Sequence, residues 1–328
     1  MDLNLASCPV CACGAMAPSG QVISVPEQLR RWETLGSIRF PDALKRRFSA
    51  PEFAAVERMD CVRCDFGEFR PLADGDQDFY AEIERSGYYN VDKWEFRKAL
   101  ADLQSHGVKS LLDVGCGSGA FLDSACSAKG LGRGLATFGF DLNPESVDIL
   151  MKKGHRGLSS SREKLGEATA SFGTFDAVSV FQTLEHVAQP LEFLRHFSEL
   201  VNSGGLLLLS TPDARGPIAH FQDALTELPP HHVGRWSRRT FEHLLPRLGF
   251  ELLEIAIEPL PDYLWDSYLP AMWRDDIWPA KEIARDPENA ALTPLEAAGL
   301  FIAQAKARGL RELVGVPGHT IYARARRL

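Results

Sequence analysis

A glycine-rich segment, "LLDVGCGSGAFL" at residues 111–122, places the strongest constraint on this chain. It sets Gly115, Gly117 and Gly119 between a strand-like apolar run and the start of a helix. Glycine lets the backbone turn tightly beside a ligand, and the amides at a helix N-terminus favour negative charge. The segment therefore predicts a nucleotide-type ligand. Its spacing alone fits both a dinucleotide and a methyl donor.

Strand-like and helix-like patterns alternate around this segment. Apolar or alternating runs predict strands over 110–115, 137–142, 155–159, 174–182, 204–212, 250–258 and 319–326. Helical patterns cover 119–130, 190–201 and 237–250, and Asn143 begins another helix. A further helix precedes the first strand, with Asp92 and Glu95 as a capping box. This order implies an α/β fold with a doubly wound, mostly parallel sheet.

Two cysteine pairs near the N-terminus have the spacing of metal ligands. Two residues separate Cys8 from Cys11, and two separate Cys61 from Cys64. Two such turns can complete a tetrahedral shell of four thiolates, which leaves no position open for water. We therefore expect a structural zinc ion, with Cys13 as a substitute for Cys8 or Cys11. Redox-active or unpaired thiols are the alternative interpretation.

The same patterns divide the chain into four parts. Residues 1–75 form the predicted zinc-binding module, in which 26–35 and 41–48 look helical. Residues 76–259 form the predicted core, and 318–328 add its last strand. Between them, residues 260–317 form an insert rich in aromatic side chains.

Charge and composition narrow the classes of partner. The net charge of −8 argues against a nucleic-acid partner, because phosphate binding normally needs a basic surface. The chain lacks the run of about 18 apolar residues that a membrane-spanning helix needs. The first residues lack the basic-then-apolar order of a secretory signal, so we expect a cytoplasmic protein.

Two acidic residues help to separate the ligands that the glycine segment allows. Asp113 lies inside the first strand, where its carboxylate needs hydrogen bonds that loop amides or a ligand ammonium can supply. A dinucleotide site needs no such acid. Asp141, after the second strand, stands where the ribose-binding acid of a dinucleotide site is also expected. An NAD-binding oxidoreductase is therefore one alternative.

Five segments point to a family when they are taken together. They are "LLDVGCGSGAFL", "FGFDLNPESV", "FDAVSVFQTLEHVAQP", "GGLLLLSTP" and "RRTFEHLLPRLGF". Their order and spacing resemble successive motifs of the class I S-adenosylmethionine-dependent methyltransferases. The resemblance covers about residues 88–258 and implies a seven-stranded sheet whose last strand runs antiparallel.

The resemblance also implies the contacts of the methyl donor. The methionine part would lie on Asp113 and the backbone of Gly115, Cys116, Gly117 and Gly119, the ribose hydroxyls on Asp141, the adenine beside Leu142, and the sulfonium beside Gln182. The family often places an acidic residue after its third strand to contact the adenine amine. This chain has only serines there, at residues 159–161.

The loop after the fifth strand supplies the first candidates for a catalytic base. His231 and His232 follow two prolines in "LPPHHVGRWS", and histidine titrates near neutral pH. Glu185 and His186, after the fourth strand, are the second candidates. A turn in which the imidazoles bind backbone groups is the structural alternative.

The acceptor is predicted only as a class. "PPHHVGRWS" looks like a segment of bacterial methyltransferases of surface-polysaccharide and glycan pathways, so we expect O-methylation of a sugar or another small hydroxylated acceptor. The aromatic insert, with Tyr263, Trp265, Tyr268, Trp273 and Trp278, is expected to form its wall; core packing and an oligomer interface are equal alternatives. An RNA methyltransferase with a zinc finger and a catalytically inactive zinc-containing scaffold are further alternatives.

Overall fold

The computed structural model describes residues 7–12, 15–36, 38–85, 93–127, 130–132, 134–161, 164–170, 172–221, 223–274 and 292–328. Cys13 and Asp92, which the sequence analysis singled out, lie outside these residues, as does Trp278. None of the described helices has the length and apolar character needed to cross a bilayer.

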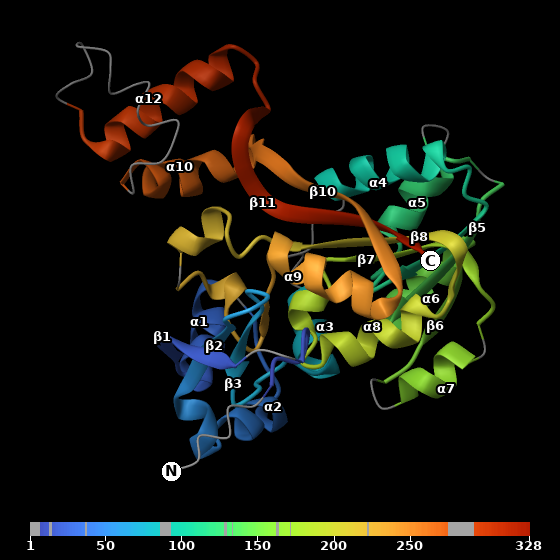
Figure 1. Cartoon of the computed structure of the whole chain (residues 1–328). Helices are drawn as coiled ribbons and strands as arrows, with labels where there is room; N and C mark the ends of the chain where they lie inside the picture. Colours follow the sequence, from blue (N-terminus) through green and yellow to red (C-terminus); the bar gives the residue numbers. More distant parts are fainter. Residues whose placement is uncertain are drawn as a thin grey trace.

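A seven-stranded sheet forms the centre of the molecule (Figure 1). Its strands, in order across the sheet, are β10 (Phe250–Pro261), β11 (Glu312–Arg327), β8 (Val201–Pro212), β7 (Phe175–Phe181), β4 (Ser110–Val114), β5 (Ala136–Asp141) and β6 (Arg156–Ser159). The pairs from β8 to β6 are parallel, whereas β11 is antiparallel to both β8 and β10. The predicted mostly parallel sheet with an antiparallel last strand is therefore confirmed.

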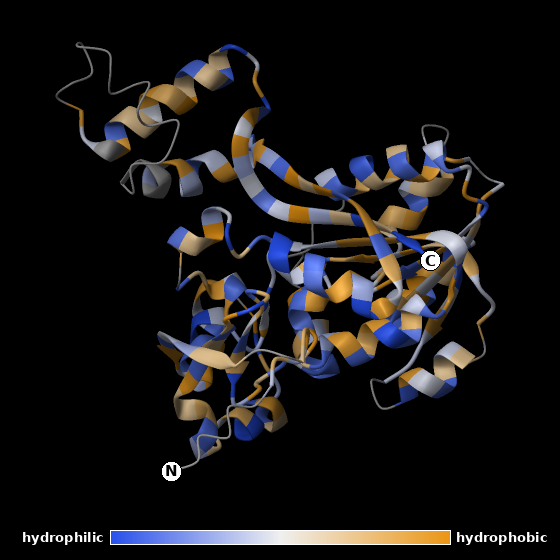
Figure 2. Cartoon of the chain, in the orientation of Figure 1, coloured by the Kyte–Doolittle hydropathy of each residue, from blue (hydrophilic) through white to orange (hydrophobic). Residues whose placement is uncertain are grey.

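Helices cover both faces because side chains alternate along the buried strands. Leu206 and Leu208 face one hydrophobic core, and Leu207 and Leu209 face the other. The first core contains side chains of α4 (Trp94–Ser105), α5 (Ala120–Cys126) and α6 (Pro144–Lys152). The second contains side chains of α7 (Leu165–Ala170), α8 (Pro190–Ser198) and α9 (Arg238–Leu244). In Figure 2 the central strands carry much of the hydrophobic colour.

Local sequence patterns predicted the ends of some helices and strands correctly and the ends of others wrongly. Asn143 caps α6 and Ser237 caps α9, each through its own side chain. The predicted capping box at the start of α4 is absent from the described residues, because Lys93 holds the N-cap position and Glu95 points elsewhere. Strand β11 begins at Glu312 rather than at 319, because it continues its pairing with β10 beyond the edge of β8.

The N-terminal region folds around a second, four-stranded sheet. Its strands are β1 (Met16–Ile23), β2 (Val56–Cys61), β3 (Gly67–Arg70) and β9 (Gly234–Arg235), and its helices are α1 (Val25–Leu35), α2 (Asp42–Phe48), η1 (Pro51–Ala54) and α3 (Gln77–Arg85). The helices α1 and α2 lie at the two segments between the cysteine pairs that look helical in the sequence. Strand β9 comes from the loop that follows β8, so this sheet joins the N-terminal region to the core.

Short 3-10 helices and the insert complete the chain. The 3-10 helices are η3 (Leu184–His186), η4 (Pro217–His220), η5 (Leu225–Glu227), η6 (Leu245–Leu248) and η7 (Asp262–Leu264). Helices α10 (Trp265–Arg274) and α12 (Pro294–Ala307) pack on the ends of β10 and β11, away from the N-terminal region (Figure 1).

Candidate functional site

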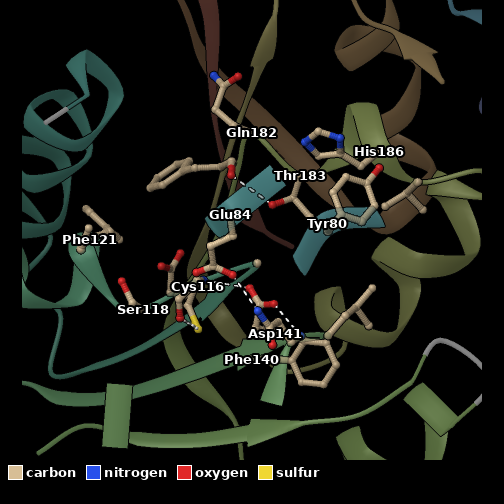
Figure 3. A pocket seen from close by; sticks show the side chains of 18 of the residues that line it. Tyr80, Glu84, Cys116, Ser118, Phe121, Phe140, Asp141, Gln182, Thr183 and His186 are labelled. Atoms are coloured by element: carbon tan, nitrogen blue, oxygen red, sulfur yellow. Dashed lines mark hydrogen bonds between the residues drawn. The ribbon is translucent and has the colours of Figure 1, made fainter. Parts of the chain in front are cut away.

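A cavity of about 340 Å³ opens at the carboxyl ends of the central strands. This is the edge where β4 lies between β5 and β7, and such a reversal of strand order is where α/β sheets bind ligands. Residues of α3, α4, the glycine segment and the ends of β5 and β7 line it. Figure 3 shows Asp141, Cys116 and Ser118 on one side of this cavity and Gln182 and His186 on the other.

The glycine segment turns at the floor of the cavity. Gly115 and Gly119 have φ values of +73° and +88°, which side chains rarely adopt. A Cβ atom on Gly115 would lie 2.1 Å from Thr183 Oγ1, and one on Gly119 would lie 2.4 Å from Leu150 Cδ1. Both positions therefore favour glycine on grounds of conformation, and Gly115 also on grounds of space. Cys116 is buried beside Gly117, and burial raises the pKa of its thiol, as suits a packing residue.

Asp141 ends β5 and holds the glycine segment. Its carboxylate accepts hydrogen bonds from the backbone amides of Gly117 (2.8 Å) and Asn143 (2.9 Å). Burial raises the pKa of Asp141, and the charge of Glu84 adds to that shift. Glu84, on α3, in turn accepts hydrogen bonds from the side chains of Asn143 and Ser146.

Asp113 is the penultimate residue of β4 and lines the same cavity. Its carboxyl accepts a hydrogen bond from Ser179 Oγ at 2.7 Å. Burial raises its pKa to about 7, against the opposing effects of Ser179 and Lys93. A ligand cation at this position would favour the ionised form of the carboxyl.

Gln182 and Leu142, which the family resemblance assigned to the cofactor, both line the cavity, whereas residues 159–161 do not. Gln182 follows β7 with φ +48°, and its Nε2 donates to Glu95 Oε1 at 3.1 Å. Glu95 is buried and also accepts a hydrogen bond from Ser210. Glu95, which the sequence predicted as part of a helix cap, therefore forms hydrogen bonds beside the cavity-lining Gln182 instead.

Three histidines gather beside the cavity, although only one lines it. His186 follows β7 in η3 and lines the cavity, and the rings of His231 and His232 lie behind it, with centroids 4.8 Å from its ring. His231 and His232 stack with their ring centroids 4.3 Å apart. Burial lowers the pKa of His186 well below its usual range and that of His231 to about 3, and the charge of His232 adds to both shifts.

Two carboxylates flank the histidines. Glu227 accepts from His232 Nδ1 (3.1 Å) and from Arg235 Nη1 (3.0 Å), and these charged partners hold its pKa well below the usual range. Glu185 is buried, with its Oε1 4.0 Å from His186 Nε2. Burial raises the pKa of Glu185 to about 8. The four residues predicted as catalytic candidates are thus brought together in one cluster.

The four predicted cysteine ligands also meet. Cys8 Sγ lies 3.5 Å from Cys64 Sγ, and Cys11 Sγ lies 3.6 Å from Cys61 Sγ. These distances rule out disulfides and are near the edge of a tetrahedral zinc–sulfur shell, about 3.8 Å for zinc–sulfur bonds of about 2.3 Å. All four side chains are buried. The cluster therefore has the donor set and spacing of a structural zinc site.

Several residues of the site carried no sequence signal that we used. Tyr80 and Glu84 on α3, and Lys93 and Phe96 at the start of α4, line the cavity. Their helices come before the glycine segment in the chain, and only the tertiary fold brings them over it.

The described part of the aromatic insert does not line the cavity. Trp265 and Tyr268 are buried in the core that α10 and α12 form, and Tyr263 is exposed. The side chain of Trp273 lies outside the described residues.

A family model of the methyltransferase domain matches residues 85–255, which is more than half of the chain. The chain belongs to the class I S-adenosylmethionine-dependent methyltransferase family. The match begins on α3 and ends on β10, so it includes the glycine segment, both aspartates and the histidine cluster. The N-terminal cysteine cluster lies outside it.

The chain also resembles individual proteins over part of its length. It is 28% identical to a ubiquinone biosynthesis O-methyltransferase of Colwellia psychrerythraea, over 49% of this chain and 63% of that protein. It is 34% identical to the enzyme of that name from Cereibacter sphaeroides, over 36% of this chain and 47% of that protein. A solved S-adenosylmethionine-dependent methyltransferase of Archaeoglobus fulgidus is 17% identical, with a TM-score of 0.47, over 76% of this chain and 100% of that one. The chain thus covers less than two thirds of these curated relatives.

Proposed function

We propose that this protein transfers a methyl group from S-adenosylmethionine to a hydroxyl group of a small acceptor, in the cytoplasm. The observation that carries the proposal is a single cavity with two ends of different chemistry. One end has Asp113 and Asp141 around the glycine segment, and the other has Gln182 and His186. The family match supports the donor, and the names of the curated relatives support O-methylation.

The first end fits the methyl donor. The carboxylate of Asp113 would attract the ammonium group of the methionine part, and the amides of the glycine segment would bind its carboxylate. Asp141 would accept hydrogen bonds from both ribose hydroxyls, while Leu142 packs beside the adenine. The sulfonium would then lie near Gln182, between the two ends.

The second end fits the acceptor. The acceptor oxygen gives a lone pair to the methyl carbon, the carbon–sulfur bond breaks onto sulfur, and the hydroxyl proton leaves. We propose that the histidine cluster, through His186 at the cavity surface, assists the departure of that proton. His231, His232 and Glu185 would act through their contacts with His186.

The acceptor class is proposed as a sugar or glycan, with a phenolic hydroxyl as the second candidate. The segment that carries His231 and His232 favours the first. The relatives named for ubiquinone biosynthesis favour the second. The acidic balance of the chain supports a small molecule over RNA.

We also propose a structural zinc ion on Cys8, Cys11, Cys61 and Cys64. The sulfur distances and the burial of the cluster support it, as does the absence of a disulfide among the described cysteines. Elemental analysis of the purified protein should find at least about one zinc ion per chain. Less than about half an equivalent in a folded sample would contradict the assignment.

Calorimetric titration followed by an acceptor panel tests the methyltransferase proposal. S-adenosylhomocysteine should bind and NAD should not; the reverse result would indicate an oxidoreductase. Labelled methyl donor with sugars, phenols and RNA should then label one acceptor class. Binding of the cofactor without labelling of any class would favour the inactive scaffold.

A further inference from the structure

We propose that His186, His231 and His232 form a metal site of their own, for a borderline divalent cation such as Zn²⁺. Each of the three residues offers a potential ligand atom, and these atoms all lie within 4.8 Å of one another. Three nitrogens at about 2.1 Å from a tetrahedral zinc ion stand about 3.4 Å apart. The rings of His231 and His232 are stacked, so binding would require them to rotate toward a common centre. The residues come from two loops, after β7 and after η5.

The hydrogen bonds of the three rings favour metal binding. His186 Nδ1 lies 2.7 Å from the carbonyl oxygen of His231, and His231 Nδ1 lies 2.7 Å from that of Thr226. A carbonyl oxygen only accepts, so Nδ1 donates in both rings and a neutral ring keeps its lone pair on Nε2. His232 Nδ1 binds the carboxylate of Glu227. This pattern is the one found behind histidine ligands of metal ions, where the second nitrogen donates to a carbonyl or carboxylate.

The charges around the cluster also suit a cation. Glu185 is 1% exposed, and neither of its carboxylate oxygens has a hydrogen-bond partner within the described residues. A buried carboxylate without such partners is costly, and a neighbouring cation would offset that cost. Glu185 Oε1 already lies 4.0 Å from His186 Nε2, at the edge of the cluster.

The donor set selects the metal. Imidazole nitrogens suit Zn²⁺ and similar transition-metal ions, whereas Mg²⁺ and Ca²⁺ prefer oxygen ligands. Three histidines leave a fourth position for water or another oxygen, as in catalytic zinc sites. His186 lines the cavity, so we place this open position on the cavity side.

The role of the ion rests on the proposed function. An acceptor hydroxyl bound at the open position would lose its proton more readily, because a metal ion lowers the pKa of a bound oxygen acid. The histidine cluster would then assist proton loss through the ion that it holds. Binding of the metal itself does not depend on this role.

Zinc titration provides the first test. Protein with its cysteine cluster already loaded is titrated calorimetrically with Zn²⁺, and then with Mg²⁺ as a hard-ion comparison. We expect one further zinc site that weakens at least about 100-fold in His186→Ala. The exposed His106→Ala is the control and should match the wild type. Equal zinc isotherms for wild type and His186→Ala would overturn the proposal.

Anomalous scattering gives a second test that needs no variant. Crystals grown with Zn²⁺ should show a peak at the zinc edge between the three imidazoles, besides any peak at the cysteine cluster. A peak at the cysteines alone would refute the histidine site. Titration of the same preparation with S-adenosylhomocysteine separates the outcomes: intact cofactor binding without the second metal leaves the proposed function standing.

Discussion

The cysteine and histidine clusters both gather metal-ligating side chains, but they differ in how completely they enclose an ion. Four buried thiols surround the centre of the first cluster, and its residues belong to the larger hydrophobic core. The second has three imidazoles, one of which lines the cavity. The comparison shows that four protein ligands, which fill the coordination shell, suit a structural role. Three ligands beside a cavity leave a coordination position free and suit a catalytic role.

The two clusters are also physically connected. The cysteine cluster is held against α9 and η6, where Thr240 donates to the Cys64 carbonyl and Arg247 to the Cys11 carbonyl. The sheet that contains β2 and β3 continues into β9, which follows His231 and His232 in the chain. Trp32, on α1, packs edge-on against His231, with ring centroids 5.5 Å apart. The N-terminal region therefore supports the loop that carries the second cluster.

Removal of a cysteine ligand should have the largest effect, and on stability. Cys64→Ala should lower the free energy of unfolding by at least about 3 kcal/mol, or about 10 °C in melting temperature, because a metal shell and core packing are lost together. Thermal denaturation with zinc analysis measures both. Cys126→Ala, at the end of α5, is the control. A melting temperature within about 2 °C of the wild type in Cys64→Ala would contradict a structural role for the cysteine cluster.

Removal of the cavity-facing histidine should instead affect turnover. His186→Ala should lower kcat by at least about 100-fold, because the assistance to proton loss disappears. Its melting temperature and its affinity for S-adenosylhomocysteine should change little, since the donor end of the cavity is intact. Unchanged turnover in His186→Ala, or a loss of stability as large as that of Cys64→Ala, would contradict the assignment of different roles to the two clusters.

Substitution at the end of the cavity with Asp113 and Asp141 should affect cofactor affinity, whereas substitution at the histidine end should affect turnover. Asp141→Ala should weaken S-adenosylhomocysteine binding about 100-fold, because the ribose hydroxyls and the Gly117 amide lose a charged acceptor. Calorimetric titration measures the loss. Asp176→Ala is the matched control, since that carboxylate binds the backbone of Lys109 and Ser110 at the other end of β4. Equal affinities in wild type and Asp141→Ala would refute the ribose contact.

Cofactor affinity should depend on pH through Asp113, with the smallest effect of the four. Because burial raises the pKa of Asp113 to about 7, its carboxyl becomes protonated below that pH. Only the ionised form attracts the cofactor ammonium, so affinity should fall about tenfold between pH 8 and pH 6. Titrations at several pH values measure the slope. In Asp113→Asn affinity should be lower and nearly independent of pH; an unchanged slope would assign it to another group.

Local sequence patterns predicted much of the fold, because buried strands and helix caps leave periodic or positional signals. Apolar runs predicted β4, β7 and β8, and Asn143 predicted the start of α6. The four-stranded N-terminal sheet escaped prediction. Strand β1 has no alternating apolar pattern and is mostly not buried, β3 has only four residues and β9 only two, so their pairing depends on distant partners.

The sequence by itself determined that the glycines, Asp113 and Asp141 share one end of the cavity, since they lie at the ends of consecutive strands that a parallel sheet must bring to one edge. It also determined the cysteine pairs, whose spacing is local. Only the tertiary structure decided that His186 joins His231 and His232, and that Glu95 meets Gln182. These groups lie far apart in the chain. Their contacts arise from how the N-terminal region and the loop after β8 pack over the sheet, which no local pattern encodes.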